Sequence, residues 1–173
     1  MARDTRIGSG FNPASKRGPV QNKMQYESVL SVLSETRADP RAISVVGGNA
    51  ADLPGYFIEP TIGTGLSEGS RLVDQETFGP VLPVLRFDDE DAAIAKVNAG
   101  AYGLRASVCS SDIGAAQIIA AKLIAGTVSI NRHVGVDPLV SFGGTNEWGA
   151  DGSSERAGCF PSQRPALYTP RSA

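Results

Sequence analysis

Short β-branched runs alternate with helical stretches from residue 81 onward, and this alternation constrains the fold more than any other feature. Residues 81–87, 106–109 and 127–130 have the composition of strands. Residues 89–98 and 113–125, which separate them, are predicted helices. Strand, helix, strand, helix, strand with short connections predicts an α/β fold with a largely parallel sheet and flanking helices.

Residues that can cap a helix precede both predicted helices. Asp88 comes before the first and Asp112 before the second, and each carboxylate can accept a hydrogen bond from a free N–H group of the first turn. Acidic residues at 89–91 also suit the positive end of the helix dipole. Gly126 is well placed to end the second helix. The second helix also has an apolar stripe, made of Ile118, Ile119, Leu123 and Ile124.

The N-terminal half predicts one long helix followed by strands. Residues 21–36 bring apolar side chains near one face at three- and four-residue spacing. The run 42–46 is β-branched and is closed by two glycines, and 56–62 looks extended. Pro83 interrupts the strand 81–87, which indicates an edge strand or a bulge there.

Length and composition indicate one folded domain. The chain has 173 residues, of which 41% are hydrophobic and 20% charged, so it can bury a core and is not expected to be disordered. Residues 1–20, rich in Gly, Ser and Pro, are a predicted loop-like lead-in. Residues 21–173 form the predicted partial domain, in which 131–173 is an irregular tail.

Charge and apolar runs exclude several kinds of partner. A net charge of −2 gives no electrostatic reason to expect nucleic acid or an anionic membrane. No apolar run reaches the roughly 18–20 residues that a membrane span needs. No apolar stretch of the kind found in secretory signals follows Met1, so a cytoplasmic location is expected.

Residue chemistry alone assigns no catalytic or metal-binding residue. His133 is the only histidine, and a lone histidine is more often a structural hydrogen-bonding group than a catalyst. Cys109 ends a predicted strand, where a buried thiol acts as a small hydrophobe, and Cys159 lies in a predicted loop. These three residues have no metal-ligand spacing. The sequence contains neither a GxSxG elbow nor a GxGxxG or P-loop motif.

The order and spacing of seven short segments are more specific than any single residue. The segments are 18–20 (GPV), 55–61 (GYFIEPT), 75–81 (QETFGPV), 98–104 (NAGAYGL), 125–131 (AGTVSIN), 142–144 (FGG) and 167–169 (LYT). In this order they resemble motifs of the NAD(P)-dependent aldehyde dehydrogenases, and the resemblance runs from about Phe11 to the end of the chain. It implies the fold of the C-terminal part of that family's catalytic domain.

The resemblance implies roles for three side chains. Glu76 matches the glutamate that holds the nicotinamide-side ribose, and a carboxylate can accept two hydrogen bonds from a ribose diol. Phe78 matches the aromatic residue that helps to position that ribose, and Phe142 matches an aromatic wall of the aldehyde pocket. The implied cofactor is NAD or NADP, and the implied substrate is an aldehyde. Glu76 and Phe78 are expected at an exposed sheet edge, near a loop.

The resemblance also implies that essential parts lie outside the matching region. In the family a cysteine thiolate attacks the aldehyde, hydride passes to the nicotinamide, and a glutamate activates the water that releases the acid. The cysteine, that glutamate and the Rossmann half all precede the matching region. The chain is therefore expected to be a C-terminal fragment that is inactive alone. Ser129 and Ser141 depart from the family pattern, as does much of 131–173.

Two other functions stay open. The first is a non-catalytic interaction module that associates with full-length dehydrogenase subunits. The second is an unrelated nucleotide binder, which would require a glycine-rich phosphate loop at a strand-to-helix turn, and the sequence has none. The strand 81–87 and the apolar stripe are expected to leave apolar surface uncovered, which predicts low solubility or homo-oligomers.

Overall fold

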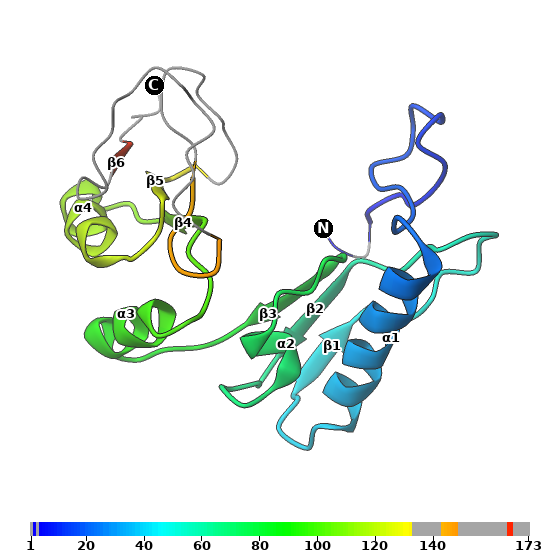
Figure 1. Ribbon diagram of the computed structural model, residues 1–173, viewed down its shortest axis with the longest axis horizontal. Coiled ribbons are helices and arrows are strands. Elements are labelled where there is room, and N and C mark those ends of the chain that lie inside the picture. Colours follow the sequence, from blue (N-terminus) through cyan, green and yellow to red (C-terminus); the bar gives the residue numbers. More distant parts are fainter. Residues whose placement is uncertain (1, 3, 133–142, 149–165, 168–173) are drawn as a thin grey trace. The chain divides into compact units, whose positions relative to one another are not determined.

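The computed structural model describes residues 2, 4–132, 143–148 and 166–167. The chain divides into two compact units, Met1–Arg86 and Phe87–Ala173, which are described separately below (Figure 1). The domain borders expected from the sequence, a lead-in over 1–20 and a partial domain over 21–173, stay predictions. None of the helices in the described ranges is long and apolar enough to cross a membrane.

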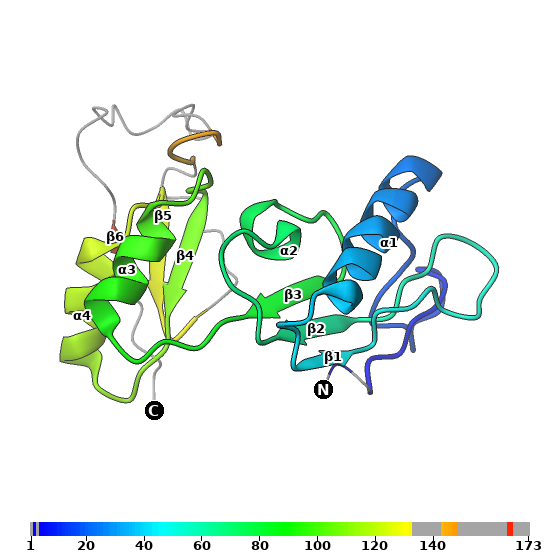
Figure 2. The same cartoon turned by 90° about the horizontal axis from the view of Figure 1, so that it is seen from below.

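The first unit packs two helices on one three-stranded sheet. Its elements are α1 (Lys23–Ala38), β1 (Ser44–Val46), β2 (Thr61–Thr64), α2 (Arg71–Asp74) and β3 (Val81–Val84). The strand order is β1-β2-β3, with β1 antiparallel and β3 parallel to β2. Figure 2 shows α1 and α2 on the same side of this sheet. The opposite face of the sheet therefore carries no helix from the described residues of this unit.

The core of the first unit lies between the helices and the sheet. The residues of α1 that point inward follow three- and four-residue spacing, and they pack against loop and α2 residues. The two buried clusters are Val29 with Leu33 and Ile58, and Val32 with Leu66 and Leu72. Burying such side chains contributes about 25 cal/mol for each Å² of apolar surface removed from water. The long predicted helix 21–36 is confirmed with borders shifted by two residues.

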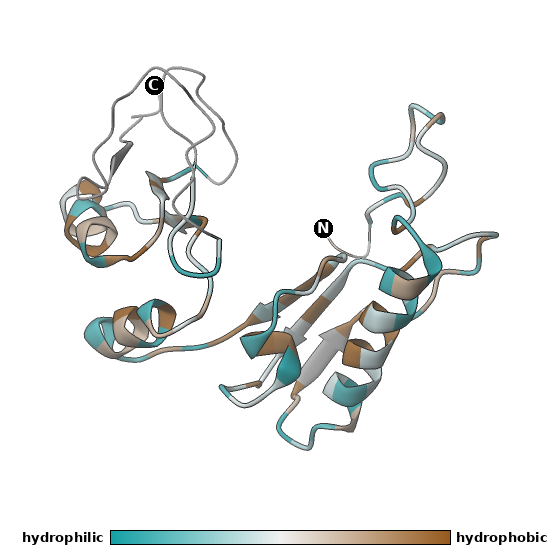
Figure 3. Cartoon of the chain, in the orientation of Figure 1, coloured by the Kyte–Doolittle hydropathy of each residue, from teal (hydrophilic) through white to brown (hydrophobic). Residues whose placement is uncertain are grey.

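Strand β3 lies at the edge of its sheet, as Pro83 predicted. Its side chains alternate, because successive residues of a strand point to opposite faces. Val81 packs into the core, whereas Leu82 is 58% exposed and Val84 is also exposed. Figure 3 shows the hydrophobic colour along β3. The described part of this unit thus presents an apolar edge strand to solvent.

The second unit also packs two helices on a three-stranded sheet. Its elements are α3 (Glu90–Asn98), β4 (Arg105–Val108), α4 (Ile113–Lys122), β5 (Thr127–Ile130) and β6 (Ala166–Leu167). The strand order is β4-β5-β6, and both pairings are parallel. Figure 2 shows α3 and α4 on one side of β4 and β5. The expected α/β fold with parallel strands and flanking helices is confirmed, with the β1–β2 pair as the antiparallel exception.

Two predictions about the ends of helices in the second unit are wrong. The N-cap of α3 is Asp89 rather than Asp88, since the Asp89 carboxylate accepts a hydrogen bond from the Ala92 N–H at 2.6 Å. The second helix ends at Lys122 with Leu123 as its C-cap, so Gly126 does not end it.

The apolar stripe of α4 is uncovered only in part. Ile118 is 62% exposed, whereas Leu123 is buried and Ile119 packs against the core. The buried residues within α4 itself are Ala116 and Ala120.

Candidate functional site

Glu76 and Phe78 lie on the loop that connects α2 to the edge strand β3. Glu76 is exposed and Phe78 is 63% exposed, so both side chains are accessible to a ligand, as the sequence predicted. The loop leads into β3, which pairs in parallel with β2, and its end is fixed to β2 by the hydrogen bond from the Thr61 N–H to the Pro80 carbonyl at 2.7 Å. The loop offers a carboxylate acceptor and an aromatic ring two residues apart. This pair of groups suits a sugar diol next to a flat ring.

The backbone of this loop is attached to α1. The Gln25 side chain donates from Nε2 to the carbonyl oxygen of Phe78 at 3.0 Å. Gly79 lies against α1 so closely that an added Cβ would stand 2.7 Å from Cγ2 of Val29. The Gly79 N–H also donates to the Thr77 carbonyl at 2.7 Å, which makes a tight turn. The backbone around Phe78 is therefore fixed while its ring stays exposed.

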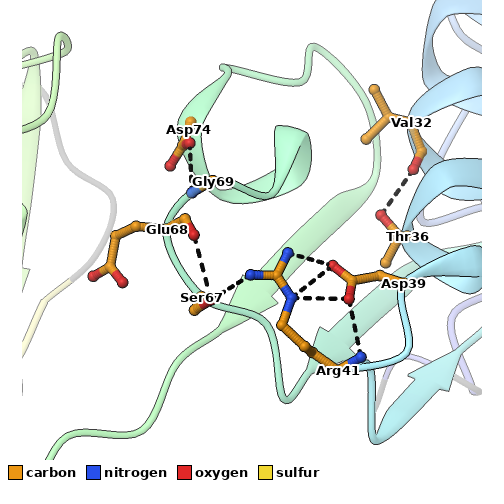
Figure 4. Close-up of polar contacts among 8 residues, drawn as sticks. All are labelled: Val32, Thr36, Asp39, Arg41, Ser67, Glu68, Gly69 and Asp74. Carbon is orange, nitrogen blue, oxygen red and sulfur yellow. Dashed lines mark hydrogen bonds and ion pairs between the residues drawn. The ribbon is translucent and has the colours of Figure 1, made fainter.

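A second polar cluster fixes the turn that follows α1 (Figure 4). Arg41 donates from Nε and Nη2 to the two carboxylate oxygens of Asp39, and from Nη1 to Ser67 Oγ at 2.7 Å. The side-chain hydrogen bond from Arg41, helped by the Arg41 backbone N–H, lowers the pKa of Asp39 from 3.8 to about 2. The same pairing raises the pKa of Arg41. The cluster connects the end of α1 to the loop that leads into α2.

Of the remaining candidate residues, the structure describes only Cys109. Phe142, His133 and Cys159 lie outside the described residues. Cys109 follows β4 directly and is exposed, so the expectation of a buried thiol is wrong. Within the described ranges, no group of three His, Cys, Asp or Glu side chains could hold a metal ion.

In the second unit, motif residues are used for internal contacts. Asn98, the last residue of α3, donates from Nδ2 to the Lys122 carbonyl at 2.8 Å. Its Oδ1 accepts from the Ile124 N–H at 2.7 Å. One amide thus satisfies both a carbonyl and an N–H group at the C-terminal end of α4. An ion pair of 2.6 Å between Lys122 and Asp91 joins the same two helices, and this contact raises the pKa of Lys122.

Asn131 has a similar structural role after β5. Its φ of 54° lies in the left-handed region, which asparagine tolerates better than most residues. Its side chain pairs twice with Ser110, accepting from the Ser110 N–H at 2.9 Å and donating to the Ser110 carbonyl at 2.8 Å. No sequence pattern indicates this pairing beyond the presence of an amide after a strand.

Two motif glycines allow a segment to pack closely on the second unit. An added Cβ on Gly126 would collide with the carbonyl oxygen of Gly143, and one on Gly103 would collide with Thr145 Oγ1. The Thr145 N–H and hydroxyl both donate to the Gly103 carbonyl, at 3.0 and 3.1 Å. These glycines are therefore explained by close approach.

Comparisons of this chain with known proteins all indicate one family. The model of the aldehyde dehydrogenase family matches residues 1–160. The betaine aldehyde dehydrogenase of Mesorhizobium japonicum is 36% identical over 148 residues, which are 83% of this chain and 30% of that protein. Retinal dehydrogenase 2 of Mus musculus is 35% identical over 138 residues, covering 80% of this chain and 26% of that protein.

Solved structures give the same result. A mutant aldehyde dehydrogenase from Bacillus cereus superposes with a TM-score of 0.80 at 35% identity, over 84% of this chain and 30% of that one. Betaine aldehyde dehydrogenase from Staphylococcus aureus in complex with NAD+ superposes with a TM-score of 0.78 at 34% identity, over 84% of this chain and 29% of that one. The chain thus spans about 30% of the length of the relatives cited here.

Proposed function

The chain belongs to the aldehyde dehydrogenase family, and from this premise we propose that it supplies the part of a cofactor site that holds the nicotinamide-side ribose. The Glu76 carboxylate accepts hydrogen bonds from two ribose hydroxyls, and the Phe78 ring lies against the ribose and nicotinamide. The supporting observation is that both side chains are exposed on one loop whose backbone is bonded to α1.

The proposed reaction is the oxidation of an aldehyde to a carboxylic acid with NAD or NADP. When bound, the cofactor accepts the hydride. The contribution of this chain is to bind and orient: Glu76 fixes the ribose, and Phe142 forms a wall of the aldehyde pocket. The same proposal includes a cytoplasmic location and a homo-oligomeric state.

The cofactor role can be tested on the 173-residue chain by saturation-transfer NMR with NADH and NADPH at millimolar concentration. We expect transfer to the protons of the nicotinamide and its ribose that exceeds transfer to the adenine. Glu76→Gln should reduce it, because a neutral amide is a weaker acceptor for hydroxyl groups than a carboxylate. Glu147→Gln, which removes an equal charge from an exposed side chain of the second unit, is the matched control. No transfer from the wild-type chain to the ligand, or equal transfer from all three proteins, would contradict the proposal.

We also propose that this chain does not oxidise aldehydes by itself, since the family's nucleophile and general base precede the matching region. A spectrophotometric assay for NADH formation should show no turnover. Turnover that disappears in Cys109→Ala or Cys159→Ala would overturn this, because a cysteine of this chain would then be the nucleophile.

A second candidate function is association with full-length dehydrogenase subunits, without catalysis. The exposed apolar side chains of β3 favour it, because an uncovered apolar edge strand is a typical site of pairing. Leu82→Lys should then weaken co-elution with a full-length relative in size-exclusion chromatography, whereas Lys16→Ala should not. Separate elution of the wild-type chain would exclude this function for that relative.

A further inference from the structure

Arg71, on the helix that leads into the Glu76 loop, donates to three side-chain acceptors. Its Nε donates to Gln75 Oε1 at 3.0 Å, and its Nη1 donates to Glu35 Oε1 at 2.8 Å and to Ser31 Oγ at 3.1 Å. Ser31 and Glu35 lie one turn apart on α1 and are joined by a hydrogen bond of 3.0 Å. Arg71 therefore links α1 to the residue directly before Glu76.

Folding stability does not account well for this arrangement. The Arg71 side chain is 34% exposed and the Glu35 side chain 53% exposed, and ion pairs at such exposure add little to stability. A guanidinium is nevertheless a rigid planar fork, whose donor directions fix the acceptors relative to one another. The contact is better suited to fixing the positions of the groups that Arg71 bonds than to stabilising the unit.

The loop is attached to α1 on both sides of Glu76. Arg71 acts on the N-terminal side through Gln75, and Gln25 acts on the C-terminal side through the Phe78 carbonyl. The Glu76 carboxylate itself stays exposed between these two attachments. A loop that is ordered before its ligand arrives binds more tightly than one that must be ordered on binding.

We infer that Arg71 is a positioning residue for the ribose-binding carboxylate: through Gln75 it fixes the place of Glu76 relative to α1 and to the Phe78 ring. The inference rests on the proposed function, in which Glu76 accepts the ribose hydroxyls. Gln75 is the connecting group, because its side chain is the only part of the Arg71 network, among the described contacts, that belongs to the loop.

The test measures the dissociation constant of NADH for the 173-residue chain by saturation-transfer titration, together with the melting temperature. Gln75→Ala is the most informative variant, since it cuts the link to the loop and leaves the Arg71–Glu35 ion pair in place. We expect Gln75→Ala and Arg71→Met each to weaken NADH binding about threefold to tenfold, the value of one hydrogen bond. Neither should weaken binding further in a Glu76→Gln background, because groups that act through one another are not additive.

Arg37→Met is the matched control. Arg37 is also exposed on α1 and bonds to the Gly47 carbonyl and to Asn49 Oδ1, away from the Glu76 loop. It should leave NADH binding unchanged. Arg71→Lys, which keeps the charge but not the fork, should behave as Arg71→Met does, and it replaces that variant if Arg71→Met does not fold.

Three results would overturn the inference, and they separate it from the proposed function. If Glu76→Gln weakens binding but Gln75→Ala and Arg71→Met do not, Arg71 has no positioning role and the proposed function stands. If the losses from Arg71→Met and Glu76→Gln add, Arg71 acts on the fold rather than through Glu76. If Glu76→Gln has no effect, the proposed function fails and the inference fails with it.

Discussion

The motif over 75–81 in the first unit and two motif asparagines in the second unit are used in opposite ways. In the first unit, the motif over 75–81 leaves Glu76 and Phe78 exposed and fixes only their backbone. In the second unit, the side-chain amides of Asn98 and Asn131 form hydrogen bonds with backbone groups of their own unit. A motif match therefore has two meanings: it marks accessible side chains at Glu76 and Phe78, and internal contacts at Asn98 and Asn131. Substitutions should separate these meanings, since internal contacts affect stability and exposed side chains affect binding.

The largest loss of folding stability is expected for Gly126→Ala. The new methyl group would collide with the Gly143 carbonyl, a backbone atom that cannot move aside cheaply, so we expect a loss of about 3 kcal/mol in the unfolding free energy. Trp148 fluorescence during urea unfolding reports on this unit, because Trp148 packs near Gly144 and is the only tryptophan.

Gly114→Ala is the matched control for that variant. The nearest atom to its new methyl group would be Asp112 Oδ1 at 3.4 Å, an ordinary contact, and the residue lies in α4. Alanine should stabilise the helix by about 0.5 kcal/mol. Similar losses for both substitutions would contradict the close-approach explanation for Gly126.

A smaller loss is expected for Asn98→Ala, about 2 kcal/mol, because it leaves the Lys122 carbonyl and the Ile124 N–H without their partner. Asn98→Asp keeps the acceptor for Ile124 but sets a carboxylate oxygen against the Lys122 carbonyl, so it should lose stability as well. Thermal unfolding of both variants measures this. An unchanged melting temperature for Asn98→Ala would show that these two hydrogen bonds do not stabilise the unit.

A still smaller effect is expected for Asp39→Asn, and it should depend on pH. The folded pKa of Asp39, about 2, is below its ordinary value of 3.8, so the pairing with Arg41 stabilises the fold fully only above about pH 4. This stabilisation is lost as the pH falls through the folded pKa. The variant should melt slightly below wild type at pH 7, and the two curves should converge near pH 2. If the difference in melting temperature between the two proteins does not change with pH, the effect does not come from ionisation of the Asp39 carboxylate.

The smallest effect on stability is expected for Glu76→Gln and Phe78→Ala, each within about 0.5 kcal/mol of wild type, because both side chains are exposed. The same variants should give the largest losses in NADH binding. Chemical denaturation set beside the NMR titration measures both quantities. A strongly destabilised Phe78→Ala would show that the ring is a structural residue after all.

Most of the architecture could be predicted from the sequence, because it follows from short-range rules. The spacing of apolar residues located α1, and the β-branched run located β5 at its observed borders. Pro83 identified an edge strand because proline cannot donate to a second neighbour. The four-residue helix α2 escaped prediction, since one turn of helix has no periodicity to detect.

The candidate site was predicted only in part, for a different physical reason. The exposure of Glu76 was expected from the family resemblance, but the Arg71 and Gln25 contacts join residues distant in the sequence. Asp88 and Asp89 are both suitable caps, and only the first hydrogen bond of α3 distinguishes them. Such choices depend on the tertiary packing, which no local pattern encodes.

The bridge that Asn98 makes has a consequence for the order in which the second unit opens. Its amide belongs to α3, but the groups it satisfies lie at and just after the end of α4, 24 and 26 positions along the chain. The Ile124 N–H can therefore exchange with solvent only when the two helices have parted. In hydrogen–deuterium exchange, the Ile124 amide should therefore exchange at the same rate as the amides of α3. The ends of α3 and α4 would then open together as one cooperative group, and not one turn at a time.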